Sequence, residues 1–345
     1  MSRSSRSSSP RWPSRALAIV FAATGAASLR LHPAHTPCSS RRDALLGAAG
    51  FFATPLLPAW SAPNPLCDPL VSQLKGPDGK EVYLVGTAHI SQESAALVRN
   101  VIRAVKPDTV MIELDASRAG RMMPPGGGAP TLATAPPAPP EKKKPSFSPQ
   151  NVALDLLQGK GDEAGTEAVG YGLSSLYKNL DEMGYQSGQE FVVAVNEARA
   201  LGADVLLGDR DARKTLQRIR EALVESVRSG ALQRALKDEA PPPAFVGESL
   251  KMDAPTQMTP DNINAMMGLL KTRENTRVLA DYIQRELPPL YTALIAERDA
   301  YMARSLLESD GQKLVAVVGL AHVDGIEAAI LREAGARDAR PRMCV

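Results

Sequence analysis

Apolar residues after residue 80 recur in two alternating patterns, short continuous runs and longer stretches with helical spacing. The run at 82–85, bounded by Gly79 and Gly86, has the length and composition of a buried strand. The stretch at 91–105 repeats apolar residues at helical spacing, and 109–114 is a second strand of β-branched character that ends in acidic residues. A strand, a helix and a strand in this order predict a βαβ unit of a parallel sheet.

The same alternation continues towards the C-terminal end of the chain. Residues 203–207 predict a third strand, and the wholly apolar run at 314–318 predicts the last one. A long helical region lies between them and is interrupted by prolines at 241–243. We therefore expect an α/β domain over residues 80–335, with a mostly parallel sheet, flanking helices and a helical excursion before the last strand.

Two segments differ in composition from this domain. Residues 124–149 are rich in Pro, Gly and Ala and carry a run of lysines, which predicts a disordered insertion. Residues 1–62 are rich in Arg and Ser, with Asp43 as their single acidic residue. An arginine pair at 41–42, followed by a weakly apolar stretch and small residues at 59–62, is typical of a twin-arginine export signal.

An upstream apolar run at 16–29 precedes that export signal. A two-stage address of this kind is similar to those that send proteins into a plastid and across the thylakoid membrane. We therefore predict that residues 1–62 are a targeting region and that the protein is located in a plastid, in the thylakoid lumen. The alternative is an ordinary secretory signal and a secreted protein.

The charge of the chain argues against one class of partner. The net charge is +2, and residues 1–60 contribute seven arginines and one aspartate, 7 − 1 = +6, so the rest of the chain carries 2 − 6 = −4. A mildly acidic domain gives no electrostatic basis for nucleic-acid binding. No later segment is long and apolar enough to cross a membrane, so we predict no membrane span in the mature protein. Cys67 and Cys344 are expected as free thiols, with a disulfide between them as the alternative.

Two histidines share one local context. His89 and His322 each follow an apolar strand and stand three residues after a glycine, Gly86 or Gly319. Functional groups of a parallel sheet gather beyond the carboxyl ends of its strands. Glu113 ends the second strand, which in a simple βαβ unit lies beside the first. We therefore expect both imidazoles and this carboxylate to face one cleft, although a single loop histidine is more often structural.

Two imidazoles and a carboxylate are a sufficient ligand set for a divalent ion that keeps one position open for water. Such an ion lowers the pKa of bound water and so supports hydrolysis. Asp209 follows the third strand and could orient a ligand histidine or bind the metal, and Arg210 could hold an anionic group of a substrate. A helix start capped by Asp211 is compatible with both roles. Glu190 is explained by a capping box that begins at Ser187, and the alternative is that it also faces the site.

Five stretches of the chain resemble the TraB family, which includes TraB, PrgY and GumN and is related to the TIKI metalloproteases. They are VYLVGTAHISQESAALVRNVIRAVKPDTVMIELD (82–115), GQEFVVAVNEA (188–198), LLGDRDARKTLQR (206–218), ERDAYMARSL (297–306) and LVAVVGLAHVDGI (314–326). In the metalloprotease members two Gly-x-x-His motifs and an acidic residue are implicated in metal-dependent peptide cleavage. The resemblance implies these roles for His89, His322 and Glu113. It also implies that Arg298 of the ERD motif, together with Asp209 and Arg210 of the Asp-Arg turn, belongs to the site. Arg210 or Arg298 would position substrate.

We therefore expect a metal-dependent peptidase or other hydrolase that acts on a peptide or protein substrate and uses manganese, cobalt or zinc. Glu113, Arg210 and Arg298 are the candidate catalytic residues, and His89, His322, Glu113 and Asp209 are the candidate metal ligands. A non-catalytic peptide-binding or regulatory protein that uses the same cleft is the alternative. In a third interpretation, both Gly-x-x-His loops are only structural elements.

Overall fold

The structure is a computed structural model that describes residues 64–88, 92–122, 188–236 and 270–335, together with residues 243 and 268. The predicted targeting region at 1–62, the predicted insertion at 124–149 and His89 lie outside the described residues. So do Ser187 and Cys344. The predictions made for them are therefore unchanged by the structure.

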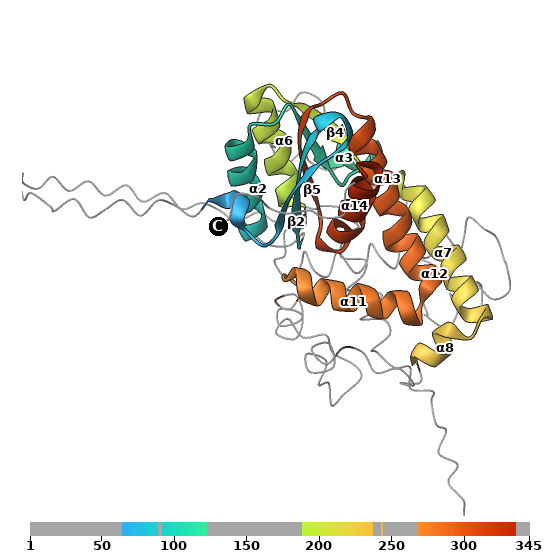
Figure 1. Ribbon diagram of the computed structural model, residues 1–345. Coiled ribbons are helices and arrows are strands. Elements are labelled where there is room, and N and C mark those ends of the chain that lie inside the picture. Colours follow the sequence, from blue (N-terminus) through green and yellow to red (C-terminus); the bar gives the residue numbers. More distant parts are fainter. Residues whose placement is uncertain are drawn as a thin grey trace, which may run out of the picture.

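A five-stranded sheet forms the centre of the molecule, and its order is β1-β2-β5-β3-β4 (Figure 1). The edge strand β1 pairs with β2 in antiparallel fashion, and all other pairs are parallel. This confirms the predicted α/β class with a mostly parallel sheet. The strands are β1 (Val71–Lys75), β2 (Glu81–Thr87), β3 (Thr109–Ile112), β4 (Asp204–Leu207) and β5 (Lys313–Gly319).

The prediction that the strand at 109–114 lies directly beside the strand at 82–85 is wrong. β5 lies between β2 and β3 and pairs with both, so the strand that ends before Glu113 does not lie beside the strand of the first Gly-x-x-His motif. The apolar residues of β5 from Leu314 to Val318 are fully buried. A strand without a polar face is stable where both faces are covered, which explains its central place.

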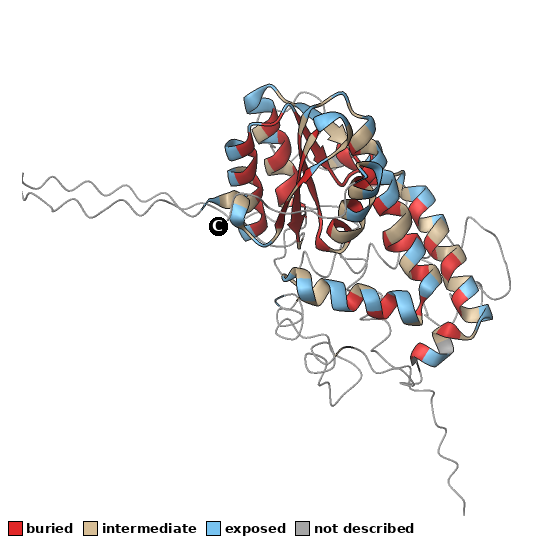
Figure 2. Ribbon diagram, viewed as in Figure 1, coloured by how far each residue is buried: buried red, intermediate tan, exposed pale blue. Residues whose placement is uncertain are grey.

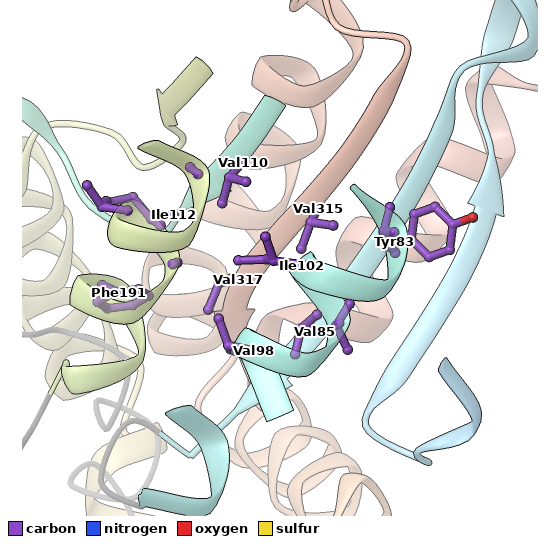
Figure 3. Packing of buried hydrophobic residues seen from close by; sticks show 14 of the residues in the cluster. Tyr83, Val85, Val98, Ile102, Val110, Ile112, Phe191, Val315 and Val317 are labelled. Carbon is purple, nitrogen blue, oxygen red and sulfur yellow. The ribbon is translucent and has the colours of Figure 1, made fainter. Parts of the chain in front are cut away.

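Helices cover both faces of the sheet, and alternate residues of β5 point to opposite layers. Val315 and Val317 pack towards α2 (Gln92–Val105) and α6 (Gln189–Leu201), where Ile102 and Phe191 are fully buried (Figure 3). Ala316 packs on the other face, towards α13 (Glu297–Glu308) and α14 (Leu320–Glu333). Figure 2 shows that the central strands β2, β5 and β3 are almost wholly buried, whereas the edge strand β4 is exposed or half-buried.

The predicted helical excursion extends from the side of this sandwich and has an apolar cluster of its own (Figure 1). Its helices are α7 (Ala212–Arg228), α8 (Ala231–Leu236), α11 (Arg273–Glu286), α12 (Pro288–Tyr291) and the π-helical turn η3 (Thr292–Ala296). The remaining elements are α3 (Ala116–Met122) and the 3-10 turns η1 (Pro65–Cys67) and η2 (Pro77–Gly79). Within the described residues, no helix is both long and apolar enough to cross a membrane.

Three local expectations can be compared with the structure. Asp211 caps α7 as expected, since its carboxylate accepts from the backbone N–H groups of Arg213 and Lys214. The residue that directly precedes α6 is Gly188, with φ 85°, and Glu190 in the first turn is fully buried; the capping box itself stays a prediction, because Ser187 lies outside the described residues. Cys67 is disulfide-bonded, which corrects the expectation of a free thiol at that position.

Candidate functional site

Three of the predicted site residues lie just beyond the carboxyl ends of adjacent parallel strands. Glu113 directly follows β3, Asp209 lies two residues after β4, and His322 is in the first turn of α14, directly after β5. Because these strands are parallel neighbours, their ends meet at one edge of the sheet. All three side chains are buried there. The insertion of β5 beside β3 therefore brings Glu113 next to the second Gly-x-x-His motif rather than the first.

Arg298 of α13 is the centre of the buried cluster. Its Nε donates to Asp209 Oδ1 at 3.1 Å, and its Nη2 donates to Asp209 Oδ2 at 2.8 Å and to Glu113 Oε1. Its Nη1 lies 3.4 Å from the Leu294 carbonyl oxygen and 2.9 Å from His322 Nε2. An arginine side chain has five N–H donors. Each of the five therefore has a protein acceptor.

Glu113 links this cluster to the backbone of the second motif. Its Oε2 accepts from the backbone N–H of Gly319 at 2.6 Å, and its Oε1 accepts from Arg298. Gly319 is both the last residue of β5 and the residue that precedes α14. The carboxylate thus holds the start of the helix that carries His322, and it also compensates part of the positive end of that helix.

The two ring nitrogens of His322 have different partners. Nδ1 lies 2.6 Å from Asp299 Oδ1, and Nε2 lies 2.9 Å from Arg298 Nη1 and 3.4 Å from Glu113 Oε1. A guanidinium group can only donate, so Nε2 has to accept. The proton of the neutral ring is therefore on Nδ1 and is donated to Asp299.

Neighbouring positive charges lower the pKa of Asp209. Burial alone would raise its pKa, but the guanidinium groups of Arg298 and Arg118 outweigh burial and hold the pKa below its ordinary value. Arg118 is itself buried, and its Nε donates to Asp115 Oδ2 at 2.5 Å. By contrast, burial raises the pKa of Asp299, although the adjacent His322 acts in the opposite direction.

Arg210 belongs to an outer, partly exposed layer of the site. It donates from Nε to Thr215 Oγ1 at 3.0 Å, from Nη1 to Glu297 Oε2 at 2.6 Å and from Nη2 to the Ala293 carbonyl oxygen at 2.8 Å. The same Glu297 accepts from Arg218 of α7. Arg210 therefore lies at the rim of the cluster. Among the described residues, its side-chain hydrogen bonds go to Thr215, Glu297 and Ala293 and not to Glu113 or His322.

Sequence reasoning missed three members of the cluster. Asp115 and Arg118 lie at the start of α3, directly after the predicted strand. Their spacing of three residues is typical of an ion pair on a helix, and this signal could have identified them. Asp299 follows Arg298 in the recognised ERD triplet, but a charged triplet in a helix is usually solvated. Only the tertiary contact with His322 shows its position.

The buried cluster carries a net negative charge when its carboxyl groups are ionised. It contains four buried carboxyl groups and two guanidinium groups, so it carries −4 + 2 = −2 when all four are ionised; the carboxyl groups are those of Glu113, Asp115, Asp209 and Asp299. A neutral imidazole whose Nδ1–H is bound by a carboxylate is the usual form of a ligand histidine. Among the described residues, however, no group of three or more His, Cys, Asp and Glu side chains has the spacing of a metal site. His89, the second predicted histidine ligand, lies outside the described range.

Comparisons with known proteins identify the class to which this fold and site belong. The model of the TraB/PrgY/gumN family matches residues 70–339, so the chain belongs to this family. The chain is 26% identical over 248 residues to an uncharacterized protein of Methanocaldococcus jannaschii, covering 71% of this chain and 52% of the relative. It is also 26% identical over 286 residues to the human TraB domain-containing protein, covering 74% of this chain and 64% of the relative. The chain thus spans between about half and two thirds of these relatives.

Proposed function

We propose that the protein is a metal-dependent hydrolase that cleaves peptides or exposed protein segments. The observation that carries the proposal is the arrangement of His322, whose Nδ1 is bound by Asp299 and whose Nε2 faces Glu113 Oε1 at 3.4 Å. Two donor atoms bound to one tetrahedral ion at about 2.1 Å are separated by about 3.4 Å. The spacing of these two atoms therefore suits a shared divalent ion.

In this proposal His322 and Glu113 hold the ion, and His89 supplies the second imidazole predicted from its matching motif. Manganese, cobalt or zinc would supply a water that ionises near neutral pH. A cation at Nε2 requires the hydrogen bond from Arg298 Nη1 to break, while the other four donors of that side chain keep their acceptors. Arg298 then remains as the group that holds Glu113 in place.

The roles of Asp209 and Arg298 differ from the first expectation, whereas the substrate-binding role of Arg210 is kept. Both oxygens of Asp209 are bound by guanidinium groups, so we assign it to the positioning of Arg298 rather than to the metal. Arg298 has no N–H without a protein acceptor, so it is a positioning residue rather than a substrate ligand. Arg210 is at the partly exposed rim and is the better candidate to bind an anionic group of the substrate.

The first experiment measures the affinity of the full chain for Mn²⁺, Co²⁺ and Zn²⁺ by calorimetry. The variants His89→Ala and His322→Ala are compared with the wild type, and His35→Ala, which changes a histidine of the predicted targeting region, is the control. We expect one tight site that is lost in the first two variants and kept in the control, and cleavage of a peptide library that depends on the same ion. A folded wild type that binds none of the three ions specifically would contradict the proposal.

A non-catalytic peptide-binding protein is the second candidate. It is favoured by the fact that Arg298 already supplies a positive charge to both Glu113 and His322 Nε2. Stoichiometric metal or peptide binding without turnover of any library peptide would support this alternative. A plastid location, with cleavage of residues 1–62, is likewise proposed and is tested by sequencing the N-terminus of the protein from its native compartment.

A further inference from the structure

We propose that Asp299 is the positioning residue of His322. It holds the proton of the imidazole on Nδ1 and so keeps Nε2 as the acceptor of Arg298 Nη1, at 3.4 Å from Glu113 Oε1. This inference rests on the proposed function for its link to metal, but the tautomer that it assigns is a property of the metal-free protein.

The position of Asp299 is set by its contact with the helix that carries His322. Asp299 lies in the first turn of α13, is 4% exposed, and its Oδ1 is 2.6 Å from His322 Nδ1. Neutral imidazole exists as two tautomers, and a carboxylate next to one nitrogen selects the tautomer with the proton on that nitrogen. In this structure that nitrogen is Nδ1, so the other nitrogen is left with its lone pair.

A second contact with α14 constrains Asp299. Gly325 lies one turn after His322 on α14, and a Cβ at this glycine would overlap Asp299 Oδ2 and lie 2.6 Å from its Cγ. The Cβ of Asp299 itself would be 3.0 Å away, so rotation of the side chain alone does not relieve the overlap. The absence of a side chain at Gly325 is therefore what allows the carboxylate to lie beside the imidazole.

Arg298 and Asp299 act on the two nitrogens in opposite ways. Arg298 donates to Nε2 while Asp299 accepts from Nδ1, so both neighbours favour the same tautomer. A proton on Nε2 would face a guanidinium N–H at 2.9 Å. Arg298 and Asp299, adjacent residues of α13, thus both favour the imidazole tautomer with its proton on Nδ1.

The test reads the tautomer by NMR of the side-chain nitrogens of ¹⁵N-labelled, metal-free full chain, with the His322 signals assigned from their loss in His322→Gln. We expect a protonated Nδ1 and an unprotonated Nε2 in the wild type. Asp299→Asn removes the charge with little change of shape, and Gly325→Ala displaces the carboxylate without changing any ionisable group. Both are expected to increase the Nε2–H population and to weaken Co²⁺ and Zn²⁺ binding about 10- to 100-fold, as loss of a group behind a ligand histidine does.

The control is Glu327→Gln, a carboxylate-to-amide exchange on α14, the helix that carries His322, at a side chain that contacts Arg273 and Ser72 instead of His322. It is expected to leave the His322 signals and metal affinity unchanged. A wild-type His322 with its proton on Nε2, or an unchanged tautomer and affinity in both Asp299→Asn and Gly325→Ala, would overturn the inference. If the wild type shows the Nδ1–H form but no variant or wild type binds metal, the proposed function fails while the role of Asp299 in setting the tautomer stands.

Discussion

At the scale of single residues, Arg298 decides how the buried charges of the site are tolerated. Ionised carboxylates are expensive to bury without a partner. Glu113 and Asp209 are both within hydrogen-bond distance of the one guanidinium group, and the pKa of Arg298 is raised above its already high ordinary value although burial alone would lower it. Its positive charge is therefore permanent, and the carboxylates depend on it.

We expect Arg298→Met to destabilise the fold by about 3–5 kcal/mol, because removal of one partner of a buried ion pair leaves uncompensated charge. The measurement is urea unfolding at neutral pH. Arg210→Met is the control, since its partner Glu297 is partly exposed and such pairs contribute about 1 kcal/mol or less. Equal stability of both variants would show that Arg298 does not compensate the buried carboxylates.

The sequence identifies some residues of the site more easily than others. Glu113 and His322 follow apolar strands, so a pattern of strands alone predicts where they lie. Asp299 and Arg118 lie in helices, and their burial depends on which helix packs over the strand ends. That packing is a tertiary property with no local signal. The expectation that Arg298 binds substrate comes from the resemblance to the family. Its N–H groups all have acceptors within the protein, and these contacts favour a positioning role instead.

At the scale of elements, α13 is held at both ends by side chains from distant parts of the chain. At its start, the π-helical turn η3 exposes the Ala293 carbonyl oxygen, which accepts from Arg210. At its end, the buried Lys80 donates from Nζ to the carbonyl oxygens of Leu307 at 2.8 Å and Ser309 at 2.5 Å. A cation at a helix C-terminus also compensates the helix dipole. The helix that carries the ERD triplet is thereby fixed along its axis.

We predict that Lys80→Met lowers the free energy of unfolding by about 1.5–3 kcal/mol, the usual range for hydrogen bonds to a charged group. Amide hydrogen exchange should become faster in the last turn of α13 before it does so elsewhere. The comparison is with Lys313→Met, because Lys313 lies at the start of β5 and is only half-buried. Unchanged exchange in α13 of the Lys80 variant would show that the helix end does not need this lysine.

The elements themselves were predicted more accurately than their arrangement. Strands β2, β3, β4 and β5 follow from short apolar runs, but β1 was missed. Its residues Val71–Lys75 include only two apolar side chains, Val71 and Leu74, and it is stable because the turn at η2 pairs it with β2. The order of the strands was not predicted, because βαβ periodicity does not specify which strand lies between two others.

At the scale of the whole molecule, Glu297 joins the helical excursion to the layer that carries the site. It accepts from Arg218 of α7 and from Arg210 after β4. Hydrogen bonds from Arg218 lower its pKa, burial acts against them, and Arg210 adds to the lowering. A carboxyl group with a lowered pKa in the folded state stabilises the fold above its unfolded pKa of about 4.3 and loses this contribution as pH falls through the folded value.

Glu297→Gln should therefore flatten the decline in stability between about pH 4.3 and the lower folded pKa, because glutamine does not titrate. Urea midpoints at a series of pH values measure this. Glu221→Gln is a useful comparison, since Glu221 also contacts Arg218 and has a lowered pKa but lies within α7 and does not join two elements. If the two variants have the same pH profile, the bridge between α7 and α13 adds nothing beyond a local ion pair.

The central place of β5 also bears on how the chain is made. During synthesis β2, β3 and β4 emerge well before β5, yet β2 and β3 have no direct pairing and meet only through β5. A nascent chain therefore holds two incomplete sheet halves with unpaired edges until its last strand leaves the ribosome, and such edges invite association with other chains. The pairing of β2 with β5 joins residues more than two hundred positions apart, which predicts slow folding. Strand order alone therefore predicts that the incomplete chain is more prone to association than the complete one.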